Sequence, residues 1–226
     1  MGMERRLLLC IAAWILVVII DVSSSVNVKK VLKPSVFSVA SMPLLLIFWT
    51  VVTNNLGPDP AKALALETGG WALRFLLLTL AMTPMSQILG TMEFVKIRRM
   101  MGLFTFFYAS LHFLVWLVFL LELRLDAFGE ELLERPFITL GFAAYLILFL
   151  LAITSPRSMV LKLGRKWKLI HRSIYLAATV ALLHLIWIVR SNFGEALVYG
   201  LVLAALFLFR LWDFLRKKIL LSNSAS

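Results

Sequence analysis

The residues of this chain best able to do chemistry are its three histidines, which lie in two strongly apolar segments. His112 lies in FFYASLHFLVW, and His171 and His184 lie in LGRKWKLIHRSIYLAATVALLHLIW (residues 163–187). Ionisable side chains are rare inside apolar, membrane-spanning segments and often mark functional sites. A helix–helix hydrogen bond is the alternative for any single histidine, and an interfacial position is a further alternative for His171. Because none of the three lies in an expected loop, a functional site is favoured.

His112 and His184 are expected at the same depth in a membrane. His112 lies about ten residues into the apolar run 102–121, and His184 about thirteen residues into the run 171–189. Both runs are expected to cross from inside to outside, so at 1.5 Å per residue both imidazoles come out roughly 15–20 Å from the cytoplasmic face. Two neutral imidazoles at one level in apolar surroundings are typical of axial ligands to haem iron.

Zinc and proton transfer fit this pair less well than haem does. A zinc site takes three or four ligands, and no Asp, Glu or Cys is expected at the depth of His112 and His184. A proton relay normally includes carboxylates inside the membrane, and none is expected near the pair. Haem is therefore the favoured ligand.

A second haem nearer the cytoplasm is supported by one histidine. His171 precedes His184 by thirteen residues, a rise of about 20 Å with a rotation of about 140° from a common helix face. An irregular helix or laterally offset haems would be required. Thirteen residues before His112 the chain has Arg99, which is a poor iron ligand but a good partner for haem propionates or an acidic cofactor. We expect one or two b-type haems, with the second ligand of an inner haem unidentified.

Two further arginines lie close to the expected haem positions. Arg74 is about one helical turn into the second expected span from the outside. It either pairs with a propionate of the outer haem or extends to the membrane interface, and the sequence leaves both interpretations open. Arg98, next to Arg99, is interpreted as a charge that orients the chain in the membrane.

The composition predicts an all-α integral membrane protein. Of 226 residues, 62% are hydrophobic and 15% are charged, and the mean hydropathy is +0.94. Apolar runs of about 20 residues suit membrane-spanning helices, and the alternating pattern of a β-barrel is missing. The net charge of +11 lies mainly between the apolar runs, where it orients a membrane protein and does not indicate nucleic-acid binding. A single cysteine, Cys10, excludes an intrachain disulfide framework and a cysteine-rich metal site.

We expect a six-helix transmembrane bundle with both ends of this core in the cytoplasm. The basic residues cluster before the first span, near residues 91–100, in residues 156–172 and near residues 216–218, whereas the segment 122–135 is acidic. If the spans alternate, all four basic clusters lie on one side, which the positive-inside rule makes cytoplasmic. Pro84 is expected to kink or end the second span. The expected spans are residues 36–53, 70–89, 102–121, 137–154, 171–189 and 196–214.

The chain is expected to comprise three parts. Residues 1–25 form an extra apolar segment that resembles a signal peptide or a short anchor, and a start placed too far upstream is a third interpretation. Residues 26–218 form the six-span domain. Residues 219–226 form a cytoplasmic tail.

Several stretches of the sequence resemble the MsrQ (YedZ) family of haem-binding membrane subunits, within the ferric-reductase-like transmembrane domains. The resemblance covers about residues 27–218 in family order and spacing, although residues 1–25 depart from the family pattern. Its motifs, followed in the chain by His184, are NNLGPDPAKALALETGGWALRF (54–75), IRRMMGLFTFFYASLHF (97–113), ERPFITLG (134–141) and LGRKWKLIHRSIYLAA (163–178).

The resemblance implies a b-type cytochrome in the bacterial inner membrane, with His112, His171 and His184 as haem ligands. It also implies FMN, to which no residues of this sequence can be assigned. Electrons would come from the quinone pool or a cytosolic flavin reductase. They would pass to a periplasmic, molybdopterin-containing methionine sulfoxide reductase subunit that repairs oxidised methionines, so this chain would be an electron-transfer subunit and the partner the catalytic one.

Two other functions remain open. The first is a stand-alone transmembrane ferric or metal reductase, which would normally need an attached flavin and nucleotide domain. The second is a transporter or scaffold without redox activity, whose histidines only join helices. Transporters usually show internal repeats and broken helices, and the sequence shows one proline-interrupted span and no evident repeat.

Overall fold

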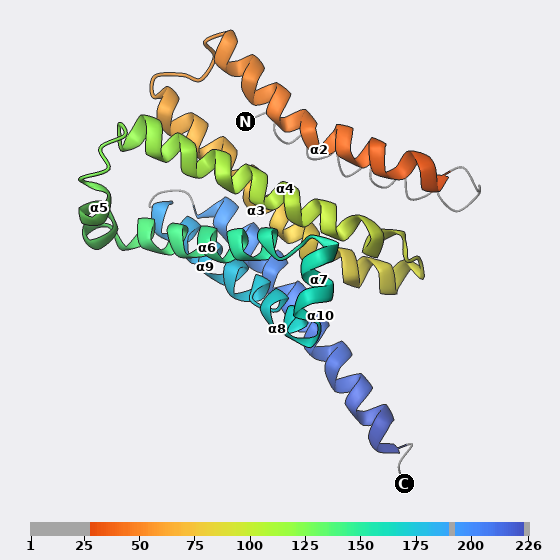
Figure 1. Cartoon of the computed structure of the whole chain (residues 1–226). Coiled ribbons are helices and arrows are strands. Elements are labelled where there is room, and N and C mark those ends of the chain that lie inside the picture. The colour runs from red at the N-terminus through yellow and green to blue at the C-terminus, as the bar shows by residue number, and fades with distance from the viewer. Residues whose placement is uncertain (1–27, 190–192, 224–226) are drawn as a thin grey trace. The chain divides into compact units, whose positions relative to one another are not determined.

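The structure, a computed structural model, describes residues 28–189 and 193–223, and these residues form helices without a β-strand (Figure 1). The chain divides into two units, residues 1–55 and residues 56–226. The first unit contains helix α2 (Val28–Val52), an apolar helix with Pro34 and Pro43 inside it. The expected segment 1–25 lies outside the described residues, so its role stays a prediction.

The second unit contains the remaining helices, and Figure 1 shows their order along the chain. Short helices separate the long ones, and a π-helix (η1) directly continues α4. The elements are α3 (Pro60–Leu89), α4 (Glu93–Val115), η1 (Trp116–Leu120), α5 (Phe128–Glu134), α6 (Pro136–Ile153), α7 (Arg157–Leu163), α8 (Arg165–His171), α9 (Ile174–Ile188) and α10 (Gly194–Asn223).

Six helical segments of the described chain are long and apolar enough to cross a membrane. This confirms the predicted all-α, six-span architecture of a multi-pass membrane protein. Most segments begin or end within a few residues of the predicted limits, but the second, third and fifth start six to ten residues earlier and the sixth ends six residues later. They are Leu32–Val52, Pro60–Leu89, Glu93–Leu120, Pro136–Ile153, Arg165–Ile188 and Gly194–Leu220.

The limits of α3 follow from its terminal residues. The Asp59 carboxylate accepts a hydrogen bond from the backbone N–H of Lys62 at 3.1 Å, and Pro60 occupies the first turn, where its missing N–H costs nothing. Gly90 ends the helix with a φ of 65°, a left-handed conformation that glycine adopts without strain. Pro84 was expected to kink or end the span, but α3 continues past it to Leu89, so an end at Pro84 is wrong.

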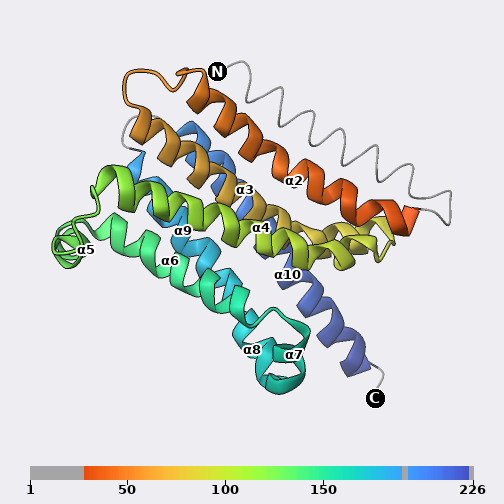
Figure 2. The same ribbon diagram turned by 45° about the horizontal axis from the view of Figure 1, so that its top comes forward.

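Two helical hairpins form the centre of the second unit. Figure 2 shows α3 beside α4 and α6 beside α9, and these two pairs make the most extensive helix contacts. Contacts between α4 and α6, and between α3 and α9, join the hairpins. Ala177 and Ala178 of α9 are fully buried, and such small side chains let membrane helices approach closely.

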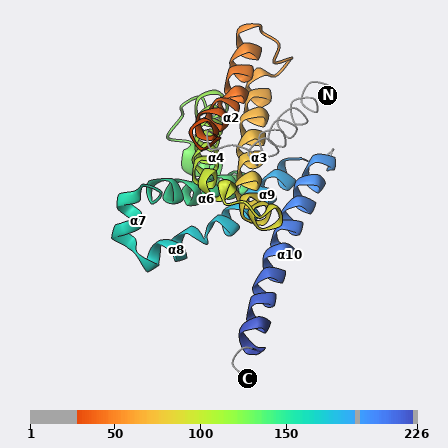
Figure 3. The ribbon, with the colours of Figure 1, turned by 90° about the vertical axis from the view of Figure 1, so that its right-hand side faces the viewer.

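Helix α10 packs against α3 and α9. Its C-terminal end extends beyond the other helices of this unit (Figure 3). The buried apolar cluster therefore draws mainly on the two hairpins, with one contribution from α10. Its buried members are Leu73, Leu76, Leu77, Leu80, Ala109, Leu148, Leu151, Ile174, Ala177, Ala178 and Leu203.

Candidate functional site

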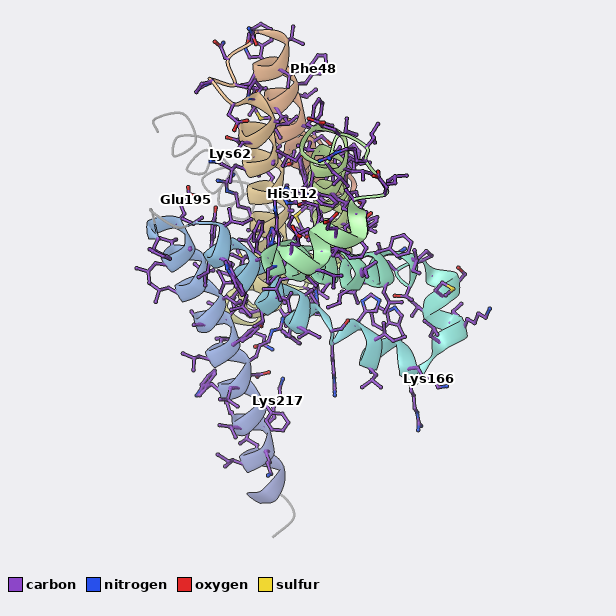
Figure 4. All side chains as sticks on the ribbon, turned by 90° about the vertical axis from the view of Figure 1, so that its left-hand side faces the viewer. Phe48, Lys62, His112, Lys166, Glu195 and Lys217 are labelled. Atoms are coloured by element: carbon purple, nitrogen blue, oxygen red, sulfur yellow. The ribbon has the colours of Figure 1, made fainter. Side chains whose placement is uncertain are left out.

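The imidazole rings of His112 and His184 lie together between the two hairpins. Their centroids are 6.1 Å apart, and the ring planes cross at 77°. His112 comes from α4 and His184 from α9, and both side chains are half-buried. Figure 4 shows His112 among the helices of this unit, away from Lys166 and Lys217. The fold thus brings together two residues that are far apart in the sequence.

Each of these histidines is fixed by a backbone carbonyl of the other helix of its hairpin, α3 for His112 and α6 for His184. Nδ1 of His112 lies 2.9 Å from the carbonyl oxygen of Ala65, and Nδ1 of His184 lies 2.6 Å from that of Phe137. A carbonyl oxygen only accepts hydrogen bonds, so Nδ1 is the donor in both rings. The lone pair is therefore on Nε2, which is the protonation state of a metal-binding imidazole held by an outer hydrogen bond.

A glycine faces each ring, one helical turn after its carbonyl acceptor. A Cβ atom on Gly69 would lie 3.0 Å from Cε1 and Nδ1 of His112. A Cβ atom on Gly141 would lie 2.7 Å from Cε1 of His184. The imidazoles therefore occupy space that any other residue at these two positions would fill.

The two arrangements repeat at a constant separation in the sequence. In each, the histidine follows its carbonyl acceptor by 47 residues. Acceptor, glycine and histidine of the first hairpin all recur 72 positions later in the second. The sequence shows no evident repeat, and this correspondence is limited to the acceptor, the glycine and the histidine. The two hairpins correspond in a backbone contact and a glycine, and not in a pattern of side chains.

The geometry of the pair fits two axial ligands on one haem iron. Metal-to-imidazole bonds are about 2 Å long, so two imidazoles on opposite sides of one metal have centroids about 6 Å apart. The distance of 6.1 Å between His112 and His184 matches this value. Within the described part of the chain, no group of three or more His, Cys, Asp or Glu residues could hold a metal ion. A pair of histidines fits the donor set of a haem iron better than that of a zinc ion, which takes three or four protein ligands.

Arg74 lies inside the bundle. Its side chain is 8% exposed, its Nε donates to the hydroxyl of Tyr199 on α10 at 3.0 Å, and its guanidinium lies 4.8 Å from the centre of the Trp71 ring. Arg74 lies five residues after Gly69 on α3. A side chain that reaches for the membrane interface would be exposed, so this burial favours the interpretation that Arg74 serves an acidic group within the bundle.

His171 lies in a separate cluster at the end of α8. Its Nε2 is 3.1 Å from the Thr154 hydroxyl, and its ring stacks on Trp167 with centroids 4.1 Å apart. The Trp167 indole N–H donates to the Thr154 carbonyl at 3.0 Å. The nitrogen that would bind iron is thus engaged with a hydroxyl in this structure, and the cluster provides no second histidine.

Arg99, the predicted partner of a haem propionate or an acidic cofactor, is exposed, whereas Arg98 is half-buried. Arg98 donates to the Thr83 hydroxyl at 3.2 Å and interacts electrostatically with His171 and Arg210. The structure therefore turns the first of the two neighbouring arginines inward.

Arg210 was missed by the sequence analysis. Its guanidinium lies 5.1 Å from the centre of the Tyr175 ring and donates to the Leu80 carbonyl at 3.1 Å. The Nε atom is buried without a hydrogen-bond partner. An arginine within the apolar run LVLAALFLFRLW of the last span was the available signal.

The comparisons with known proteins identify the family of this chain. A family model described as "Ferric reductase like transmembrane component" matches residues 68–182. A "Protein-methionine-sulfoxide reductase heme-binding subunit MsrQ" from Xanthomonas oryzae pv. oryzae is 42% identical over 84% of this chain and 88% of its own length. Proteins of the same name are 38% identical in Polaromonas naphthalenivorans, over 80% of this chain and 84% of theirs, and in Bordetella pertussis, over 83% and 92%. The chain therefore belongs to the ferric-reductase-like transmembrane family and, within it, to the MsrQ proteins.

Proposed function

We propose that this chain is the haem-binding membrane subunit of a bacterial methionine sulfoxide reductase system, with one b-type haem between His112 and His184. The observation that carries the proposal is the facing of these two imidazoles at 6.1 Å with both Nδ1 atoms hydrogen-bonded to carbonyls. The relatives are named as haem-binding subunits of a methionine sulfoxide reductase, which supports both the haem and the reductase system in this proposal. A haem in this position supplies a one-electron carrier inside the membrane.

The residues of the chain hold the iron ligands and set their basicity. Hydrogen bonds from Nδ1 to the carbonyls of Ala65 and Phe137 place extra electron density on Nε2, which favours the oxidised iron. Arg74, buried beside Trp71 and bonded to Tyr199, supplies the positive charge for a haem propionate.

The second part of the proposal concerns the direction of electron transfer across the membrane. The basic clusters of the sequence favour a topology with both ends of the six-span core in the cytoplasm, and we infer that the membrane is the bacterial inner one. Electrons enter from the quinone pool or a cytosolic flavin reductase. They leave towards a periplasmic, molybdopterin-containing methionine sulfoxide reductase subunit, which performs the repair reaction.

On the cytoplasmic side, Arg98 and Arg210 are suited to an acidic cofactor such as FMN. Both are drawn into the bundle, and neither takes part in the ion pairs of the described residues, which are Lys96–Glu93, Arg135–Glu131 and Lys217–Asp213. Arg99 lies at the exposed margin of the same region. His171 is the candidate ligand of a second haem, and its bond to Thr154 would have to be exchanged for a bond to iron.

The proposal is tested on the full chain, purified from membranes in detergent. We expect a reduced-minus-oxidised spectrum of a b-type cytochrome. His112→Ala and His184→Ala should each remove or convert the low-spin signal of this haem, whereas His171→Ala, which removes the candidate ligand of a second haem, should leave the signal of the His112–His184 haem in place. A chain without haem, or a low-spin signal that is the same in His112→Ala and His184→Ala as in the native protein, contradicts the proposal.

A further inference from the structure

We propose that Gly69 and Gly141 are positioning residues that keep one backbone carbonyl open to each imidazole and thereby hold the two rings in crossed planes. This inference rests on the proposed haem between His112 and His184. It adds a specific task for two residues that touch neither iron nor substrate. The task is to fix ring orientation, which the identity of the ligands alone leaves free.

The reason for glycine lies in helix geometry. In an α-helix the carbonyl of residue i points at the N–H of residue i+4, so the side chain of residue i+4 stands next to that oxygen. Gly69 follows Ala65 by four residues, and Gly141 follows Phe137 by four. Because neither has a Cβ atom, the Ala65 and Phe137 carbonyls accept a second hydrogen bond from outside their own helix.

The available space is small in both places. A Cβ atom would lie 3.0 Å from His112 at position 69 and 2.7 Å from His184 at position 141. Carbon atoms in contact prefer separations of about 3.5–4 Å, so an alanine at either position must displace the ring. The shorter distance predicts the larger displacement at Gly141.

The hydrogen bond from Nδ1 to the carbonyl oxygen fixes the plane of each imidazole ring. An imidazole that is free to turn about its bond to iron has no preferred plane. Here the Nδ1 atom of each ring is tied to a carbonyl, and the two carbonyls belong to different helices, α3 and α6. The result is a crossing angle of 77°. Crossed axial imidazoles make the frontier orbitals of low-spin ferric iron nearly equal in energy, which produces a strongly anisotropic electron paramagnetic resonance (EPR) signal.

The recurrence of this arrangement argues against chance packing. Carbonyl, glycine and histidine stand at the same spacing in both hairpins, although the flanking residues differ: Gly69 is followed by Gly70, and Gly141 by Phe142. Other helical glycines of this unit lack such a role. A Cβ atom on Gly102 would lie 3.7 Å from Thr79, and one on Gly200 would lie 3.8 Å from Leu182, which are ordinary contacts. These two glycines are therefore matched controls.

The experiment compares Gly141→Ala and Gly69→Ala with the controls Gly102→Ala and Gly200→Ala in the full, haem-loaded protein. We expect a strongly anisotropic low-spin signal in the native protein and both controls. Gly141→Ala should lower haem occupancy several-fold or convert the signal to a high-spin or less anisotropic one, and Gly69→Ala should do so to a smaller degree. Helix content and gel-filtration behaviour show whether each variant is folded. Gly69→Ala, which needs the smaller shift, remains informative if Gly141→Ala fails to fold.

The outcomes separate this inference from the proposed function. A native protein without haem overturns both. Native haem that depends on His112 and His184, but keeps its occupancy and EPR signal in Gly141→Ala and Gly69→Ala, overturns the role of the glycines and leaves the proposed function standing. A native low-spin signal of small anisotropy contradicts the crossed ring planes.

Discussion

Trp167 stacks on His171 with ring centroids 4.1 Å apart and an interplanar angle of 27°. The Trp167 indole N–H and the His171 ring share one partner residue, since the first donates to the Thr154 carbonyl and the second lies 3.1 Å from the Thr154 hydroxyl. Thr154 ends α6, whereas Trp167 and His171 belong to α8. This three-residue cluster therefore ties the second hairpin together at the end away from the His112–His184 pair.

The first prediction concerns this cluster. Trp167→Phe keeps an aromatic ring on His171 but removes the hydrogen bond to Thr154, so it should lower the free energy of unfolding by about 1 kcal/mol. Trp167→Ala removes the stacking as well and should cost about 1 kcal/mol more. Thermal unfolding in detergent, followed by circular dichroism, measures both. The low-spin haem signal should be unchanged, and its loss in Trp167→Phe would contradict the separation of the cluster from the haem pair.

The second prediction concerns Arg74. Arg74→Leu removes a buried positive charge next to the proposed haem, and a cation near the iron favours the reduced state. The midpoint potential should therefore fall, by on the order of 1 kcal/mol or about 40 mV for one electron. A redox titration of the purified protein followed at the haem absorption bands measures the shift.

Arg124→Leu is the matched control for this experiment, because Arg124 is an exposed arginine in the loop after η1. Its removal should leave the potential unchanged. Equal potentials in the native protein and Arg74→Leu would show that Arg74 only holds Tyr199 and does not act on the haem.

The third prediction compares the two neighbouring arginines Arg98 and Arg99 of α4. Arg98 is half-buried and bonded to Thr83, whereas Arg99 is exposed. If an acidic cofactor binds among the inward arginines, Arg98→Leu should lower the flavin content of the purified chain several-fold, and Arg99→Leu should lower it less. Flavin fluorescence after denaturation, normalised to protein, measures the content. The opposite order would assign the cofactor to Arg99, as the sequence spacing alone suggested.

The fourth prediction concerns the start of α3, the helix that carries Ala65, Gly69 and Arg74. The Asp59 carboxylate caps its first turn, so Asp59→Ala should lower the free energy of unfolding by about 1 kcal/mol. Asp126→Ala, which removes an exposed carboxylate from a loop, is the control for the change in charge. Equal melting temperatures of the two variants would show that the cap does not stabilise the helix.

Much of the fold could be predicted because hydrophobic length is a local property. Runs of about 20 apolar residues have few alternatives in a membrane, so the six spans followed from composition. The helix limits were harder, since polar first turns such as Asp59-Pro60 extend α3 well beyond its apolar run. The end of α3 was also hard to predict, because one proline such as Pro84 inside a long, packed helix need not end it.

The sequence by itself determined that the chain crosses a membrane and that His112 and His184 share a depth, because both follow from counting residues at a fixed rise per residue. The tertiary structure determined the direction and the burial of the side chains, which depth in the membrane does not fix. It brought the two rings to a centroid distance of 6.1 Å and buried Arg98 more than Arg99. It also placed Thr154 beside His171 and Arg210 beside Tyr175. The physical reason is that the direction of a side chain around its helix depends on how neighbouring helices pack. That packing is set by contacts between residues far apart in the chain, such as Gly141 with His184.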